Sequence, residues 1–567
     1  MAAGPQLTMP RPLGETLTSR QKWLLLVSLM LAMFVSALNQ SVVATATPKM
    51  LADLGGFSLL SWVFTVYMLT STVITPLVGK LSDMFGRKQF ILAGIVIFVL
   101  GSAGCGFSTN MPMLIAFRAF QGIGGGVIMA TVFSTLGDLF PPAERGKYIG
   151  FFTGTFTIAG LSGPSIGGLL TDHVSWRWCF FVSIPFAIAA MVFIWANLPS
   201  RARGGQLRSI DFVGAALLSA ATTCLLLALA WAQREYGWGS METAGLLLSS
   251  GLLLVAFVFQ ERRHPQAVLP LTIFRNREFV IANLVAMLLG AGSFGAVQYL
   301  PTFVQTSLGS SATASGLVTT PQSLGLLVTS IVGGQMLSRR GQYKAQCVAG
   351  AGLVLVGVLC MQTLDVGQPA WRLGGFMAVI GLGSGLVMPT MSVVSQNAVT
   401  HDLMGVATSA RQFFMQIGNV LGVAVFGVIL ASSYSAAFTS DLSPEAKQAL
   451  PPALVARFDD PTLALNGREF AAVQQQVLAL DNGQALLDEA TATQRASVAV
   501  AIRHIFLGAV VVVALALLAT LGLKGLPLRR AFEATARPLP PAGGAPRTAV
   551  APSPGPAAAG DSTAGGQ

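Results

Sequence analysis

The sequence predicts an all-α membrane protein with fourteen transmembrane helices, and three observations predict it. Hydrophobic residues fill 53% of the 567 positions and charged residues only 10%, whereas soluble domains carry roughly 25% charged residues. Apolar runs long enough to cross a bilayer recur along the chain. Lys and Arg gather in alternate loops between these runs, which is the positive-inside pattern of membrane proteins.

The individual spans follow from length, because a bilayer core of about 30 Å needs roughly 20 apolar residues. The runs that meet this length are 23–47, 58–79, 90–108, 112–136, 148–170, 178–197, 210–232, 242–260, 279–304, 313–337, 345–363, 371–396, 405–432 and 501–523. With a cytoplasmic N-terminus, the short outer loops hold only Lys49, Arg177, Arg234 and Arg372. A missed helix would invert this bias, so we expect both termini to be cytoplasmic in a plasma or bacterial inner membrane.

The spans divide the chain into five predicted parts. These are a cytoplasmic N-terminus, an N-terminal six-helix bundle, two additional helices with linkers, a C-terminal six-helix bundle and a disordered cytoplasmic tail, at 1–22, 23–200, 201–278, 279–523 and 524–567. The tail is rich in Pro, Ala and Gly and cannot bury a core. Residues 433–500 form an outer loop with helix-like stretches, including a helix start at Ser443-Pro444-Glu445. This loop is either a helical linker or a cap that handles substrate.

Charge and reactive side chains exclude several classes of protein. The net charge of +11 does not indicate nucleic-acid binding, because the basic residues do not cluster with aromatic residues on one polar face. The five cysteines and four histidines are scattered, so we predict neither a disulfide framework nor a metal site. No Walker loop or spaced catalytic set is present, which argues against an ATP-driven pump and against an enzyme. We expect no cofactor.

An internal repeat relates the two predicted bundles. Residues 122–131 read GIGGGVIMAT and residues 381–390 read GLGSGLVMPT. The segments 79–86 and 334–341, each bounded by glycines, repeat at a similar offset. Two similar halves related by an axis along the membrane normal place a substrate site at their interface near the middle of the bilayer.

The loop between the second and third spans, GKLSDMFGRK, carries the first candidate site. Gly79 and Gly86 permit a tight turn and close approach of helices. Asp83 can accept hydrogen bonds from the free N–H groups of a helix start, or pair with Arg87. Such a loop would lock two helices on the inner face, so we assign it, with Lys88, a role in gating.

Two further motifs lie inside the predicted spans. Arg118, in the outer half of the fourth span, should face a polar interior, because an Arg in mid-membrane costs about 2.5–3.5 kcal/mol. The fifth span contains GLSGPSIGG at residues 160–168. There the glycines would let a neighbouring helix approach and the proline would bend the helix. A bent, tightly packed helix between the halves suits a gate, which we assign to Gly163, Pro164, Gly167 and Gly168.

These three motifs, with WRWCFFVSIP at residues 176–185, closely resemble the major facilitator superfamily, and specifically its fourteen-helix drug:proton antiporter branch. The resemblance runs from about residue 34 to residue 523, apart from the outer loop. It implies a major facilitator fold of two six-helix bundles plus two extra helices. It also implies alternating access, a central cavity and coupling to inward proton flow. The glycine–proline motif marks exporters more than importers in that superfamily.

One position departs from that branch, which typically has an Asp where this chain has Asn39. Such a carboxylate is a natural proton carrier and a natural partner for Arg118, whereas Asn cannot titrate. Asp138, near the inner end of the fourth span, is the acid closest to a helix interior, and we take it as the candidate proton carrier. The alternative is that export is driven otherwise or by charge on the substrate, with Arg118 binding Asn39, backbone carbonyls or an anionic substrate.

The candidate cavity lining consists of aromatic and amide side chains, namely Gln40, Trp62, Tyr67, Gln298, Tyr299, Gln322, Phe413 and Gln416. Polyspecific sites favour large apolar walls with few polar groups, although helix packing explains each of these residues equally well. The lack of acids deep in the spans fits neutral, zwitterionic or anionic lipophiles better than strongly cationic drugs.

The sequence therefore predicts a monomeric multidrug efflux transporter embedded in the lipid bilayer, which would confer drug resistance by exporting hydrophobic small molecules in exchange for protons. Two alternatives stay open. One is an exporter of lipids or lipophilic metabolites. The other is a nutrient importer on the same fold, against which the glycine–proline motif and the two extra helices weigh.

Overall fold

The computed structural model describes residues 13–55, 59–200, 211–234, 236–310, 312–461, 463, 467–525 and 528. These residues are almost entirely helical and contain no strand. Thirteen helical segments among them are long and apolar enough to cross a membrane. The predicted all-α membrane class is therefore confirmed. Of the predicted tail, all residues except Lys524, Gly525 and Leu528 lie outside the described part.

The first group of helices, which we call the N bundle, holds the first six predicted spans. They are α2 (Ser19–Leu54), α3 (Leu60–Phe85), α4 (Arg87–Gly106), α5 (Met111–Leu139), α6 (Pro142–His173) and α8 (Ser183–Asn197), with the short helices α1 (Leu13–Thr16) and α7 (Trp178–Phe181). Polar caps fix where two of them begin. Thr18 forms a capping box with Gln21 at the start of α2, and Asn110 accepts from the Met113 N–H at the start of α5.

Helix α6 is the one predicted span that is not among the thirteen apolar segments. It is long enough, at 32 residues, but it is rich in Gly and Thr. The hydroxyls of Thr153, Thr155 and Thr157 each bond a carbonyl oxygen one turn earlier in the helix, at 3.0 Å. Because these hydroxyls are satisfied within the helix, they do not require water around it.

The second group, which we call the C bundle, holds the last six predicted spans. The first of these spans is interrupted by π-helical turns and consists of α11 (Arg277–Leu289), η4 (Gly290–Phe294), α12 (Gly295–Val297), α13 (Leu300–Thr302) and η5 (Phe303–Ser307). The other five are α14 (Ala312–Arg340), α15 (Lys344–Cys360), α16 (Ala370–Asn397), α17 (Met404–Asp441) and α21 (Gly483–Leu521). The interrupted segment lies tightly against α17, since a Cβ at Gly295 would meet the Gly422 backbone within 2.8 Å.

The two bundles use equivalent helix contacts. In the N bundle α5 packs against α3 and α4, and in the C bundle α16 packs against α14 and α15. The glycines of the internal repeat make these contacts. A Cβ at Gly124 would meet the backbone of α4 at 2.5 Å, and one at the equivalent Gly383 would meet the backbone of α15 at 2.5 Å. The repeat therefore records close helix packing that both bundles need.

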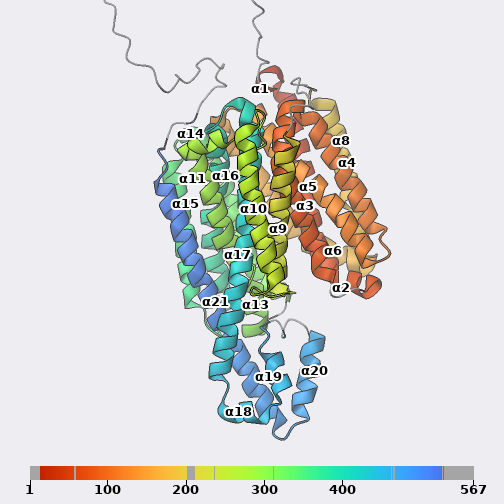
Figure 1. Ribbon diagram of the computed structural model, residues 1–567, viewed down its shortest axis with the longest axis vertical. Coiled ribbons are helices and arrows are strands. Elements are labelled where there is room, and N and C mark those ends of the chain that lie inside the picture. The colour runs from red at the N-terminus through yellow and green to blue at the C-terminus, as the bar shows by residue number, and fades with distance from the viewer. Residues whose placement is uncertain are drawn as a thin grey trace, which may run out of the picture. The chain divides into compact units, whose positions relative to one another are not determined.

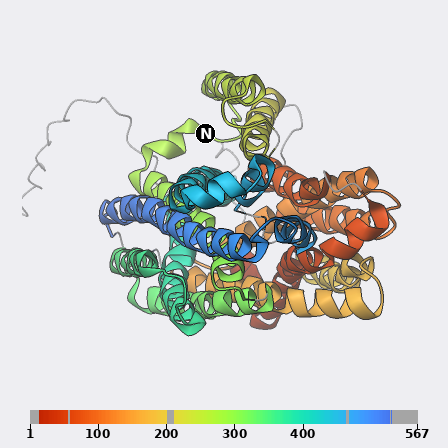
Figure 2. The ribbon, with the colours of Figure 1, turned by 90° about the horizontal axis from the view of Figure 1, so that it is seen from below.

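The most extensive contacts between the bundles are made by two pairs of helices, α3 with α17 and α6 with α14, and smaller ones by α5 with α17 and α6 with α16. The extra helices α9 (Phe212–Arg234) and α10 (Met241–Arg263) pack on each other, and α9 also contacts both α3 and α17. Figure 2 shows this pair, in yellow-green, lying outside the bundles beside those two helices. The indole rings of Trp62 and Trp231 meet edge to face there, with centroids 6.1 Å apart. The extra pair thus flanks one of the two seams.

The predicted outer loop is a compact helical hairpin extension, visible at the lower end of Figure 1. Helix α17 continues to Asp441 and α21 already begins at Gly483, and α18 (Pro444–Ala449), α19 (Pro452–Phe458) and α20 (Gly467–Leu478) lie between them. The predicted helix start is confirmed, because the Ser443 hydroxyl accepts from the Ala446 N–H at 3.1 Å. The Tyr434 hydroxyl donates to the Phe458 carbonyl at 2.5 Å in the buried centre of this extension.

Candidate functional site

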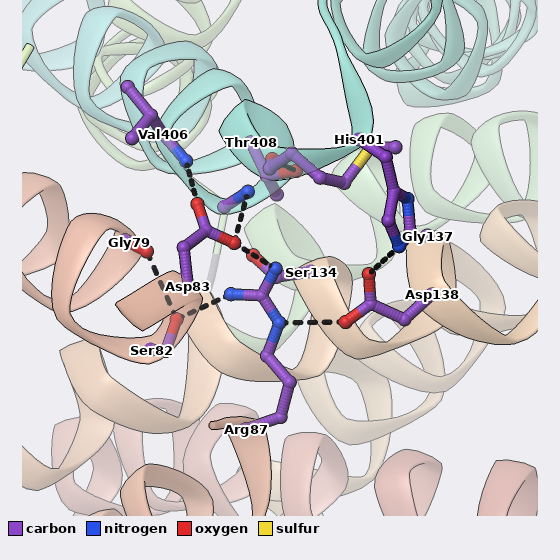
Figure 3. Close-up of polar contacts among 12 residues, drawn as sticks. Gly79, Ser82, Asp83, Arg87, Ser134, Gly137, Asp138, His401, Val406 and Thr408 are labelled. Atoms are coloured by element: carbon purple, nitrogen blue, oxygen red, sulfur yellow. Dashed lines mark hydrogen bonds and ion pairs between the residues drawn. The ribbon is translucent and has the colours of Figure 1, made fainter. Parts of the chain in front are cut away.

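The loop between α3 and α4 builds a buried polar cluster at one end of the two bundles. The sequence predicts that this end is cytoplasmic, and we call it the inner end. Gly86 has φ of +103°, a conformation that favours glycine, and the turn brings Arg87 back over Asp83. Arg87 donates to Asp83, to Ser82 Oγ at 2.6 Å and, through Nε, to Asp138 Oδ2 at 2.9 Å (Figure 3). Arg87 and both carboxylates are at most 6% exposed.

Asp83 also reaches across to the C bundle. Its two carboxylate oxygens accept from the backbone N–H groups of Gly405 and Val406, both at 3.1 Å. These N–H groups belong to the first turn of α17, where unpaired donors carry partial positive charge. The sequence allowed Asp83 either a helix start or Arg87 as its partner, and the structure gives it both.

Asp138 provides a second connection between the bundles. It lies at the inner end of α5, and its Oδ1 is 3.5 Å from Nε2 of His401, which belongs to the short helix η7 (His401–Leu403) before α17. Asp83, Arg87, Asp138 and His401 thus form one chain of ionisable groups, which we call the inner network (Figure 3). The predicted gating residue Lys88 lies outside it, because its ammonium group bonds the Trp195 carbonyl of the N bundle at 2.6 Å.

Arg145, at the start of α6, closes the inner end of α5. Its guanidinium donates to the carbonyls of Gly137 and Phe140 at 2.6 and 2.7 Å, where a cation is favourable at a helix C-terminus. It also approaches Gln396 and Met404 of the C bundle at 3.5 Å. Sequence reasoning assigned no role to Arg145, Gln396 or His401. Their contacts between the bundles join residues at least 251 positions apart in the chain.

Helix α6 lies at a seam between the bundles, as predicted, but its glycines divide between two neighbours. A Cβ at Gly163 or Gly167 would meet Ser41 or Thr45 of α2, within the N bundle, at 2.0 and 2.2 Å. The glycines that face α14 lie earlier in the helix, where a Cβ at Gly150 would meet the Ser330 carbonyl at 2.4 Å. Gly168 has open space around it. The quoted glycine–proline segment therefore faces the N bundle, and the seam contact comes from glycines outside it.

Arg118 forms a separate buried cluster, which we call the Arg118 cage. Its Nη1 donates to Asn39 Oδ1 at 2.8 Å and to Gln121 Oε1 at 2.7 Å, and its Nε donates to the Val63 carbonyl at 3.1 Å. The ring of Tyr67 lies 4.4 Å from the guanidinium carbon. The predicted contact with Asn39 and a backbone carbonyl is confirmed. Each of the three oxygens bonded to Arg118 is uncharged, so these contacts bring it no carboxylate.

The three predicted coupling residues do not form one site. Arg118 and Asn39 are bonded to each other, whereas Asp138 belongs to the inner network. Arg118 and Asp138 lie twenty positions apart on the same helix α5, which corresponds to roughly 30 Å at about 1.5 Å per residue. At this separation the two side chains cannot contact each other directly.

The predicted cavity residues fall into two sets. Gln40 and Gln298 are exposed and Gln322 is half-buried, so their amides can meet a ligand. The other predicted residues are engaged in packing or hydrogen bonds: Trp62 with Trp231, Tyr67 with Arg118 and Ser36, Tyr299 with the Val423 carbonyl, Phe413 with Phe414, and Gln416 with Thr72. The contact between Gln416 and Thr72 is a further one between the bundles.

Comparison with known proteins agrees with this architecture. The Major Facilitator Superfamily model matches residues 29–423. The multidrug transporter protein MdtP of Bacillus subtilis (strain 168) is 38% identical over 75% of this chain and 78% of its own. Multidrug resistance protein 3 of the same organism is 33% identical over 74% of this chain and 82% of its own.

Among solved structures, the human organic anion transporter MFSD10 (TETRAN) matches with a TM-score of 0.54. The match covers 87% of this chain and 99% of that one. At 14% identity this likeness shows the fold alone. Since the family model covers most of the chain and both bacterial relatives align along most of their own length, the chain belongs to the Major Facilitator Superfamily and is a multi-pass membrane transporter of small molecules, not an enzyme.

Proposed function

We propose that this chain is a multidrug exporter, which moves hydrophobic small molecules out of the cell by alternating access and is driven by proton influx. It would act as a monomer in the cell membrane, with both termini cytoplasmic. The names of its two bacterial relatives, a multidrug transporter and a multidrug resistance protein, support this class of substrate. The observation that carries the proposal is the inner network, because it is a closure between the bundles built from groups that can change charge.

The contacts between the bundles support an alternating mechanism. At the inner ends, Asp83 bonds the first turn of α17 and Gly150 lies against Ser330 of α14. Further out, α6 turns Gly163 and Gly167 to α2 of its own bundle. Helices joined at one end in this way can tilt about that end, so the central space would be closed to the cytoplasm and would release substrate outward.

A proton would act on this closure through Asp138. Its carboxylate is buried between Arg87 and His401, where the loss of a negative charge removes its attraction for both partners. Arg87 would then keep Asp83 as its carboxylate partner and Ser82 as a neutral one, and the link from α5 to η7 would weaken. Protonation of Asp138 would thus loosen the inner closure and favour the inward-open state.

The test is dye transport in everted membrane vesicles, with and without an imposed pH gradient. Asp138→Asn should abolish the part of transport that depends on the gradient, because the amide cannot titrate. Asp172→Asn is the matched control, since Asp172 is an exposed acid that bonds Lys49 on the outer side. Unchanged gradient-driven transport in Asp138→Asn would remove Asp138 as the carrier. The absence of dye export by the unaltered protein would overturn the proposal of multidrug export.

A further inference from the structure

The Arg118 cage holds a positive charge that its own contacts do not balance. The guanidinium is 1% exposed, and its three bonded oxygens come from two side-chain amides and one backbone carbonyl. Asp53 and Asp172 have partners of their own, since Asp53 accepts from Trp176 and Asp172 pairs with Lys49. A buried charge is normally paired, so this one calls for an anion from outside these contacts.

Two unused hydrogen-bond donors lie beside the guanidinium. Asn39 and Gln121 are 1% and 0% exposed, and both turn their amide oxygen toward Arg118. Their amide nitrogens, Nδ2 and Nε2, are buried and have no hydrogen-bond partner. Buried donors in native proteins are almost always paired. A group that accepts hydrogen bonds and carries negative charge would satisfy both amides and the guanidinium together.

The cage borders an exposed position of α2. Tyr67 covers the guanidinium, and its hydroxyl is 3.2 Å from Ser36 Oγ. Gln40, the next residue after Asn39 on α2, is exposed. A side-chain movement of Tyr67 would open Arg118 to a ligand that enters beside Gln40.

We propose that Arg118, Asn39, Gln121 and Tyr67 form a binding site for a singly charged anion. The anion is either the carboxylate head of a lipophilic acid or a free chloride ion. One guanidinium balances one negative charge, whereas a doubly charged phosphate would leave an excess charge in a buried place. This inference rests on the proposed export function only in naming a lipophilic acid as cargo, and the binding site itself does not depend on transport.

Asn39→Asp provides the main test, because it places a fixed carboxylate where the Asn39 oxygen now bonds Arg118. The probes are dansyl-undecanoic acid and its neutral amide, and their fluorescence measures binding to the purified full chain in detergent. The unaltered protein should bind the acid at least tenfold more tightly than the amide. Asn39→Asp should lower affinity for the acid at least tenfold and leave the amide unchanged, which also shows that the variant is folded.

The matched control is Gln476→Glu, which makes the same amide-to-carboxylate change at an exposed position of α20 in the outer extension. It should leave binding of both probes nearly unchanged. The proposal would be overturned if the unaltered protein binds acid and amide with equal affinity and chloride does not raise its Tm. Equal losses of acid binding in Asn39→Asp and Gln476→Glu would also overturn it.

A second measurement separates the two sources of the anion. Thermal unfolding is compared in sodium chloride and in sodium gluconate at equal sodium concentration. If chloride raises the Tm of the unaltered protein but not of Asn39→Asp, a free anion fills the cage. If only the lipophilic acid raises the Tm of the unaltered protein, the cage binds the carboxylate of the substrate. If neither chloride nor the acid raises it, the proposal is wrong. Asp138→Asn should keep binding of the acid, because Asp138 lies outside the cage. If the unaltered protein binds the acid but exports no dye, that result counts against the proposed function alone.

Discussion

Gly79 and Gly405 let the backbones of α3 and α17 touch beside the inner network. A Cβ at Gly79 would lie 2.0 Å from Ser409 Oγ and 2.7 Å from the Gly405 carbonyl. A Cβ at Gly405 would in turn lie 2.5 Å from the Gly79 carbonyl. Because backbone atoms cannot move aside as a flexible side chain can, even one added methyl group must separate these helices. The hydrogen bonds that Asp83 accepts from Gly405 and Val406 depend on the short distance between these helices.

Gly79→Ala should therefore weaken the inner closure and lower the melting temperature of the detergent-solubilised protein. Overpacking of this kind costs about 1–3 kcal/mol. Gly168→Ala is the comparison, since nothing lies within 4 Å of its added Cβ and Ala is better than Gly in a helix by about 1 kcal/mol. It should leave the melting temperature equal or slightly higher. If the two variants unfold at the same temperature, close approach at Gly79 does not hold the closure.

Sequence reasoning at this scale succeeded where contacts are local and failed where they are distant. Asp83 and Arg87 are four positions apart on either side of a glycine turn, so their pairing could be predicted from spacing. The contact between Arg118 and Asn39 could be predicted only through the resemblance to a family. His401 carries no signal in the sequence, since its partner Asp138 is 263 positions away. Nothing but the folded chain reveals that pairing.

At the scale of elements, hydrophobicity predicted the membrane segments well and the helix ends poorly. The predicted span 405–432 corresponds to a helix that continues to Asp441, and 501–523 to one that begins at Gly483. Both continue because side chains beyond the bilayer, including Tyr434 and Phe438, are buried against the outer helices. An apolar run marks where lipid surrounds a helix. It does not mark where packing against protein prolongs that helix.

Tyr434→Phe tests how firmly this outer extension is built. The change removes the hydroxyl that bonds the Phe458 carbonyl and leaves that buried acceptor unpaired, at a cost of about 1–3 kcal/mol. Hydrogen exchange in α19 and α20 should become faster. Ser432→Ala is the control, because the exposed Ser432 hydroxyl bonds only carbonyls of its own helix. Unchanged exchange in Tyr434→Phe would mean that this bond does not hold the extension together.

At the scale of the whole transporter, the two bundles meet along two seams that are not alike. Helix α9 contacts both helices of the seam between α3 and α17, whereas the seam between α6 and α14 is built on glycine contacts such as Gly150 with Ser330. The extra helices were predicted from the length of their apolar runs and from the alternation of basic loops along the chain. Their place beside one seam was not, because loop charges report the side of the membrane and carry no information about neighbours within it.

A crosslink between the bundles should stop transport if they tilt against each other. Thr72 and Gln416 are hydrogen-bonded across the first seam. In a background without other native cysteines, Thr72→Cys with Gln416→Cys should lose transport on treatment with a short bifunctional reagent and recover it on reduction. The control pair lies within the N bundle, where Thr171 Oγ1 is 3.3 Å from the native Cys179 Sγ. Thr171→Cys with Cys179 should crosslink without loss of transport, and equal inhibition in both pairs would contradict relative tilting.

The length of α17 and α21 has a consequence outside the bilayer. These helices contain 38 and 39 residues, or roughly 57 Å at about 1.5 Å per residue, against a hydrocarbon thickness of about 30 Å. The outer extension is thus carried by two continuous helices that both belong to the C bundle. Because displacement grows with distance from the axis of rotation, a small rotation of that bundle would move the extension sideways by a larger distance. An antibody fragment bound to the extension would therefore detect or block the conformational change of the transport cycle without contacting the substrate pathway.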